Sequence, residues 1–170
     1  MDTSTAQFHK IIFKLTVDAD GYPPVGYESM WGIQRGAGAY ELDNTPCYLY
    51  GVSKGDWVLT RADAHELIAT GVVRQSGHST LRVFAERESE RSSIVQHLRS
   101  LGARCMLTPG LSLFTVDIAS EVSFCAIDYY LSAITDDQHI AYEDACLQHG
   151  DIDPARMSEC LSLASLEAQA

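Results

Sequence analysis

The first half of the chain consists of short runs in which apolar and polar residues alternate. Residues 10–15 are the clearest case, because Ile11, Phe13 and Leu15 fall on one face and two lysines on the other, which is typical of a half-buried strand. Runs with turn signals between them predict further strands at residues 29–35, 39–42, 57–59, 67–74 and 80–85. A meander of this kind must cover its apolar face, so we expect it to curl into a small barrel.

The last two of these strands are predicted to be the arms of a hairpin. They flank Ser76, Gly77 and His78, a short polar segment with a central glycine, and such a segment is typical of a tight turn.

The second half changes to the spacing of helices. Residues 89–101 place apolar side chains at helical spacing, and Gly102 follows where a helix often ends. Strands are predicted at residues 104–107 and within 111–118, where the apolar pattern slips and indicates a bulge or burial on both faces. A helix capped by Ser120 or Ser123 is predicted through Ile134, with helical continuation over residues 140–148.

The predicted fold is α+β in one compact domain over residues 1–170. Residues 8–85 form the curled antiparallel β-meander. Residues 80–148 follow the order strand, helix, strand, strand, helix, which is most of a ferredoxin-like α/β unit. Residues 149–170 are expected to be a helical extension, since Asp153 and Pro154 are favoured at a helix start and the helix could run to Ala168.

The charge is concentrated in the last third of the chain. Residues 1–116 hold 12 acids against 11 bases, whereas residues 117–170 hold 11 acids against Arg156 alone, within a formal net charge of −11. Such a region repels phosphate backbones, which argues against direct nucleic-acid binding, and it attracts basic partners. A solvated surface that maintains solubility would have the same composition. The candidate acidic contacts are Asp136, Asp137, Glu143 and Asp144.

Cysteine usage and the start of the chain predict a cytoplasmic protein. The five cysteines form no Cys-x-x-Cys pair, and the polar N-terminus resembles no signal peptide, so we expect reduced thiols and no membrane segment. No metal or cofactor is expected. Zinc-ligand spacing is missing, and the Asp-x-Asp-Gly sequence at residues 18–21 has Ser29 where a calcium loop needs its glutamate.

The segment 74–82 holds the densest group of polar side chains with chemical potential. Arginines beside exposed turn amides could hold an anion, and His78 could act as a general acid or base. A catalytic pair of His-x-Thr motifs would need a second copy, which no other histidine supplies, and a structural turn explains the same residues. The candidate binding residues are Arg74, Ser76, His78, Ser79 and Arg82; no catalytic residue is assigned.

A set of short motifs over residues 8–148 resembles the bacterial domain-of-unknown-function family 4265. The most specific is the run from Ser76 to Arg82. The others are Asp20-Gly21-Tyr22-Pro23-Pro24, Glu28-Ser29-Met30-Trp31, Leu42-Asp43-Asn44-Thr45-Pro46, Gly55-Asp56-Trp57-Val58 and Tyr142-Glu143-Asp144-Ala145-Cys146-Leu147. The resemblance implies kinship and no particular reaction.

These observations favour a non-catalytic cytosolic interaction protein. The most concrete form is an immunity protein that binds and neutralises an antibacterial toxin, since a toxin acting on nucleic acid would be basic and would suit an acidic partner. One alternative is an enzyme, or a protein that binds a small anion or nucleotide at the Ser76–Arg82 hairpin. Another is a regulator of an RNA-processing enzyme, which only the ferredoxin-like half suggests.

Overall fold

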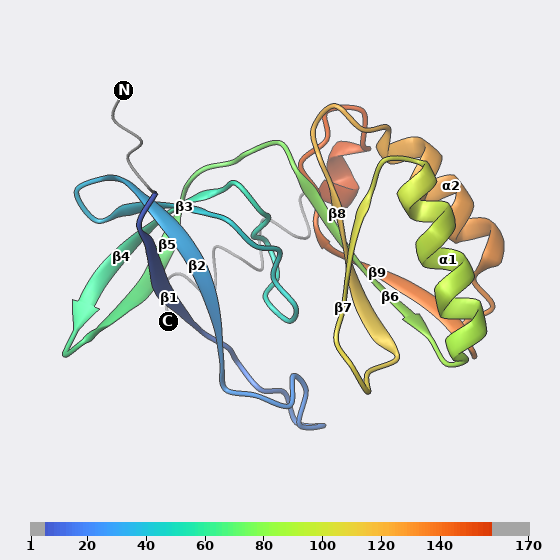
Figure 1. The fold of residues 1–170 in the computed structure, drawn as a ribbon, viewed down its shortest axis with the longest axis horizontal. Coiled ribbons are helices and arrows are strands. Elements are labelled where there is room, and N and C mark those ends of the chain that lie inside the picture. The colour runs from blue at the N-terminus through green and yellow to red at the C-terminus, as the bar shows by residue number, and fades with distance from the viewer. Residues whose placement is uncertain (1–5, 158–170) are drawn as a thin grey trace.

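The computed structural model describes residues 6–157, which form two modules side by side (Figure 1). The first module is a closed barrel in the order β1-β2-β3-β4-β5, so the predicted curled meander is confirmed. Its strands are β1 (Phe8–Lys14), β2 (Tyr27–Gly36), β3 (Ala39–Leu42), β4 (Trp57–Asp63) and β5 (Glu66–Arg74).

The barrel closes through a parallel pair. Consecutive strands of the meander are antiparallel, so the first and fifth run in the same direction, and Ile11 and Ile12 of β1 pair with Leu67 and Ile68 of β5. Alternate residues fill the interior: Ile11, Phe13, Met30, Tyr40, Leu42, Leu49, Val52 and Val58. Gly32 faces this interior, because a Cβ there would collide with the side chain of Ile11 and lie 3.1 Å from that of Tyr40.

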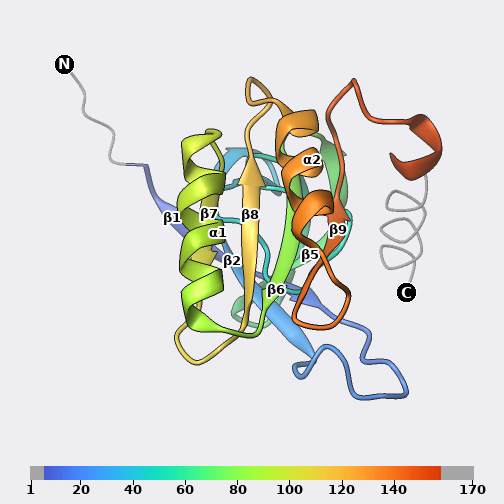
Figure 2. The same ribbon diagram turned by 90° about the vertical axis from the view of Figure 1, so that its right-hand side faces the viewer.

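The second module is a four-stranded antiparallel sheet in the order β7-β8-β6-β9. Its elements are β6 (Ser79–Ala85), α1 (Glu88–Ser100), β7 (Arg104–Leu107), β8 (Leu113–Ile118), α2 (Phe124–Ile134) and β9 (Ile140–Cys146). Both helices lie on the same face of the sheet (Figure 2). The predicted ferredoxin-like half is therefore present, with β9 as its fourth strand.

The core of this module lies between the sheet and the two helices. Leu81 and Val83 of β6 face Leu98 of α1 and Ile127 and Leu131 of α2 within one buried cluster. β8 is buried on both faces along most of its length, which accounts for its irregular apolar pattern without a bulge in its pairing with β6.

The predicted hairpin around Ser76–His78 is wrong. β5 pairs with β4 and β1 in the barrel, whereas β6 pairs with β8 and β9 in the other sheet. Residues 75–78 are thus the connection between the modules. Two apolar runs joined by a glycine-containing segment look like a hairpin locally, but here each strand has partners on both sides that come from elsewhere in the chain.

The predicted helical continuation over residues 140–148 is also wrong, because this segment contains β9. The edge of β6 would otherwise be open, and backbone hydrogen bonds to β9 satisfy it. The local spacing of apolar residues contains no information about the unpaired backbone groups of a strand elsewhere in the chain.

Helix ends follow the sequence signals. Gly102 has a positive φ of 97° just after α1, and the Ser123 hydroxyl accepts the Ala126 amide at the start of α2. Residues 154–157 are helical as predicted from Pro154, and the rest of the helix expected to reach Ala168 lies outside the described residues. Among residues 6–157, no helix has the length and apolar character needed to cross a membrane.

Candidate functional site

The two modules meet in a layer of buried and half-buried polar side chains that we call the seam: Ser53, Asp56, Ser76, Thr80, Arg82 and Gln148. Its centre is Asp56, which directly precedes β4 in the chain and has no exposed surface. Its carboxylate accepts the amides of Ser53 at 2.9 Å and Ser76 at 2.8 Å, and the side-chain amide of Gln148 at 2.9 Å. Burial raises the pKa of Asp56, and these donors oppose that shift.

The connection between the modules is bound into the seam residue by residue. The Ser76 hydroxyl donates to the carbonyl of Lys54 at 2.7 Å, and the Gly77 amide donates to Oε1 of Gln148 at 2.8 Å. The hydroxyls of Thr80 and Ser53 lie 2.8 Å apart. Ser76 therefore serves backbone positioning in this structure.

Ser79 and His149 form a buried pair on the helix-covered side of β6. Nε2 of His149 lies 3.1 Å from the carbonyls of Ala119 and Val122, which can only accept, so this nitrogen carries the proton. Nδ1 then accepts the Ser79 hydroxyl at 2.7 Å, while that hydroxyl accepts the Gln148 amide at 2.8 Å. The Ser79 hydroxyl and the His149 ring bind backbone groups as well as each other, so the pair fixes the position of the segment after β9.

Arg82 is the largest buried polar side chain of the seam and has no exposed surface. It donates to the carbonyl of Leu49 and, at 3.0 Å, to Glu143 on β9, while its guanidinium stacks 4.2 Å from the Tyr50 ring centroid. The Tyr50 hydroxyl donates to the same glutamate at 2.9 Å. Burial and the carboxylate of Glu143 raise the pKa of Tyr50 to about 12.

Glu28, near the start of β2, anchors the loop that carries Leu49 and Tyr50 through hydrogen bonds. Its carboxylate accepts the amides of Cys47, Tyr48 and Leu49. Two of the predicted site residues, Arg82 and Glu143, thus come together here, and each neutralises the other.

His78 lies beside the seam and differs from its other candidates. Its Nδ1 is 2.7 Å from Oδ1 of Asp117, a β8 residue only 1% exposed. This hydrogen bond raises the pKa of His78, with smaller effects from Glu121 and, in the opposite direction, Lys54. A neutral imidazole held in this way has its lone pair on Nε2, as a general base requires. No sequence signal pointed to Asp117, an acid among mostly apolar strand residues.

The remaining candidates are spread over separate surroundings. Arg74 is exposed at the end of β5, with its guanidinium 5.0 Å from the Trp57 ring centroid. The Asp136 carboxylate accepts the amides of Gln138, His139 and Ile140, and these bonds lower its pKa to about 2.

Asp137, Glu143 and Asp144 do not share one surface either. Asp137 is exposed in the turn before β9, with φ at 58°. Asp144 receives two hydrogen bonds of 2.7 Å from Arg156. Successive strand residues point to opposite faces, so Glu143 meets the barrel loop while Asp144 is on the helix side.

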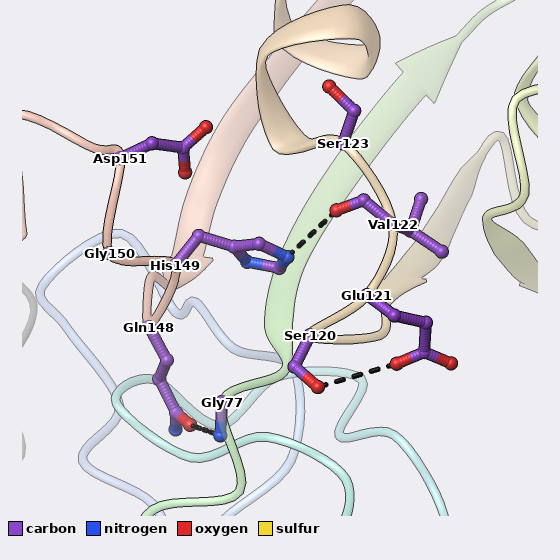
Figure 3. Close-up of a pocket in the computed structure, with 9 residues that line it drawn as sticks. All are labelled: Gly77, Ser120, Glu121, Val122, Ser123, Gln148, His149, Gly150 and Asp151. Atoms are coloured by element: carbon purple, nitrogen blue, oxygen red, sulfur yellow. Dashed lines mark hydrogen bonds between the residues drawn. The ribbon is translucent and has the colours of Figure 1, made fainter.

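A cavity of about 450 Å³ opens beside the N-terminal end of α2 (Figure 3). It is lined by Gly77, Ser120, Glu121, Val122, Ser123, Gln148, His149, Gly150 and Asp151. Figure 3 shows Glu121 and Asp151 on different sides of His149, and these two are the carboxylates of the lining. No cluster of metal-ligating side chains is found within residues 6–157.

The sequence model described as "Domain of unknown function (DUF4265)" matches residues 28–142. The chain belongs to the DUF4265 family. The crystal structure titled "Novel crystal structure of a hypothetical protein from Neisseria gonorrhoeae" aligns with a TM-score of 0.68 over 85% of this chain and 98% of that chain. Its identity of 13% supports a shared fold alone. A search of curated proteins gave no match.

Several of the motifs that resemble the DUF4265 family place residues at or next to the seam. Asp56, the run from Ser76 to Arg82, and Glu143 belong to it or contact it, and Glu28 supports the loop above Arg82. These motif residues therefore help to join the two modules.

Replacement of Gly77 tests the geometry of the connection. Gly77 has φ at 88°, and an added Cβ would lie 3.1 Å from that of Ser120, so Gly77→Val should lower the free energy of unfolding by about 1–3 kcal/mol. Gly110→Val is the matched control, since its φ is 82° with no atom within 4 Å of an added Cβ. Chemical denaturation of both variants should show the larger loss at Gly77, and equal losses would exclude the contact with Ser120.

The His78–Asp117 pair should make stability depend on pH. The pKa of His78 is raised above its ordinary value of 6.5, so the folded state binds the proton more tightly than the unfolded state. The resulting stabilisation is complete below about pH 6.5 and is lost as the pH rises through the raised pKa. Urea unfolding between pH 5.5 and pH 9 should show this decline, and Asp117→Asn should flatten it; an identical profile in the variant would contradict the assignment.

Proposed function

We propose that this protein is a non-catalytic interaction protein of the bacterial cytoplasm, most concretely an immunity protein that binds and neutralises an antibacterial toxin. The observation that supports a binding role is that the motif side chains form hydrogen bonds within the protein. Ser76, Ser79 and Arg82, which resemble catalytic or anion-binding groups in sequence, bind backbone or buried partners. The free cysteines among residues 6–157 are consistent with a reducing compartment.

A small-anion site built on the two arginines has less support from the geometry. Arg82 is buried against Glu143, whereas Arg74 is exposed beside Trp57 on the barrel. They therefore do not converge, and the charge of one is already compensated.

The charge distribution supports a basic partner. The last third of the chain holds 11 acids and one arginine, and Arg156 is bound to Asp128 and Asp144. The excess negative charge in this region accelerates encounter with a positively charged protein and disfavours nucleic acid.

Association with a basic toxin domain should therefore slow markedly as salt increases. Between about 0.05 and 0.5 M salt the screening length falls from above about 10 Å to about 4 Å. Stopped-flow mixing with the purified toxin domain, once affinity capture has identified it, measures the association rate. A rate independent of salt would remove the electrostatic basis of the proposal.

The second candidate function is an enzyme in which His78 acts as a general base. The specific observation in its favour is the 2.7 Å contact with the buried Asp117, which orients the imidazole. Two residues that line the cavity are related to His78. Gly77 precedes it in the chain, and Glu121 contributes electrostatically to its raised pKa.

The variant His78→Ala separates the two functions. A binding protein should lose about 1 kcal/mol of stability through the missing hydrogen bond and still protect cells from the toxin. An enzyme with His78 as its general base should lose the same hydrogen bond to Asp117, and its rate should also fall by roughly two to four orders of magnitude. Thermal unfolding measures the stability and a cell-protection assay measures the function, and complete loss of protection in a variant that still folds would refute the non-catalytic proposal.

A further inference from the structure

The two helices that cover the sheet differ in what they present to solvent. They lie side by side on one face (Figure 2). The exposed residues of α1 are polar or charged, namely Glu88, Ser89, Ser92, Ser93, Gln96, His97, Arg99 and Ser100. Those of α2 are Cys125, Ala126, Tyr129, Ser132 and Ala133. We call these five residues the outer face of α2, and none of them carries a formal charge.

A helix at a protein surface ordinarily places charged and polar side chains toward solvent, as α1 does. The outer face of α2 instead carries no charged side chain: besides a cysteine and a serine it holds two alanines and Tyr129, which is 81% exposed. Tyrosine contributes a large contact area with few rotatable bonds and is enriched at protein interfaces. One face of α2 packs on the sheet, and the composition of its outer face is typical of a surface that contacts another molecule.

Exposed acids lie at both ends of this face. Glu121 and Asp151 line the cavity beside the N-terminal end of α2 (Figure 3), and Asp136 and Asp137 follow its C-terminal end. Asp136 stays ionised far into the acidic range, because three backbone amides lower its pKa to about 2.

The segment of the chain that carries this surface holds few cations, while the neighbouring helix α1 carries the exposed Arg99. Within residues 117–157, Arg156 is the sole lysine or arginine, and it is engaged by Asp128 and Asp144. The surface therefore combines an uncharged centre with negatively charged ends, which complements an apolar patch rimmed by lysine or arginine.

We propose that the outer face of α2 is the docking surface for a basic protein. An apolar side chain of the partner packs on Tyr129 and the alanines, and a lysine or arginine enters the cavity that Glu121 and Asp151 line. This assignment rests on the proposed binding function and names the surface that performs it. It keeps Asp136 and Asp137 from the predicted acidic contacts and leaves out Glu143 and Asp144, which form ion pairs with Arg82 and Arg156.

Site-specific photo-crosslinking tests which molecule covers this face. The full chain is produced in the bacterium that carries its gene, with p-benzoylphenylalanine in place of Tyr129. A control protein carries the same group in place of Tyr27, a tyrosine of β2 that is 59% exposed on the barrel. The expected result is an adduct with a basic protein at position 129 and none at position 27, identified by mass spectrometry.

Every other result overturns the assignment. An adduct with a second copy of this chain, with its own residues 158–170, or with an acidic protein would identify a different occupant. No adduct at position 129 would mean that the face is uncovered. A basic protein crosslinked only at position 27 would move the interface to the barrel while leaving the proposed binding function intact, which separates the two failures.

The crosslinked basic protein, once purified, is then the probe for affinity. Tyr129→Ala and the double variant Glu121→Gln with Asp151→Asn should each weaken binding at least about tenfold. Tyr27→Ala and Asp63→Asn, which alter an exposed aromatic and an exposed acid of the barrel, should leave affinity within about twofold. Circular dichroism verifies folding of each variant, and unchanged affinity in both α2-face variants would refute the proposal.

Discussion

The buried carboxylate of Asp56 sets the position at which the barrel meets the sheet. A carboxylate removed from water is tolerated only when donors replace its hydration. Its donors come from the barrel loop at Ser53, from the connection at Ser76 and from Gln148 beyond β9. These three segments are far apart in the chain, so satisfying one side chain fixes the relative placement of both modules.

Arg82 extends the same constraint along β6. Its guanidinium must be compensated inside the protein, and Glu143, the Leu49 carbonyl and the Tyr50 ring do this together. Because Glu28 holds the loop that supplies two of these groups, a residue of β2 influences the surroundings of a residue in the other module. Polar residues that would suggest chemistry in an isolated motif here hold the structure together.

The seam is internal, and His78 with Asp117 is the part of the motif region whose geometry also suits proton transfer. On the solvent-facing side of the helix layer, the exterior of α1 is polar and charged, whereas the exterior of α2 is uncharged. A protein whose polar motifs stabilise its fold can recognise a partner through such an outer surface.

Elements with local signals could be predicted from the order of the amino acids alone. Alternation in residues 10–15 and 39–42, Gly102 after α1 and Ser123 before α2 predicted strands and helix ends correctly, because period and capping depend on neighbouring residues. The curled meander and the ferredoxin-like order followed from the sequence of these elements. The motifs also indicated the family correctly over residues 28–142.

Strand pairing and the contacts of the polar residues, in contrast, depend on the folded arrangement of the whole chain. The segment around Gly77 joins two modules instead of turning a hairpin, and Ile140–Cys146 is a strand because β6 has an edge to satisfy. The pairing of Arg82 with Glu143, and of His78 with Asp117, links residues 61 and 39 positions apart. Such contacts depend on strand register and on the need to compensate buried charge, and neither is encoded in the spacing of residues along the chain.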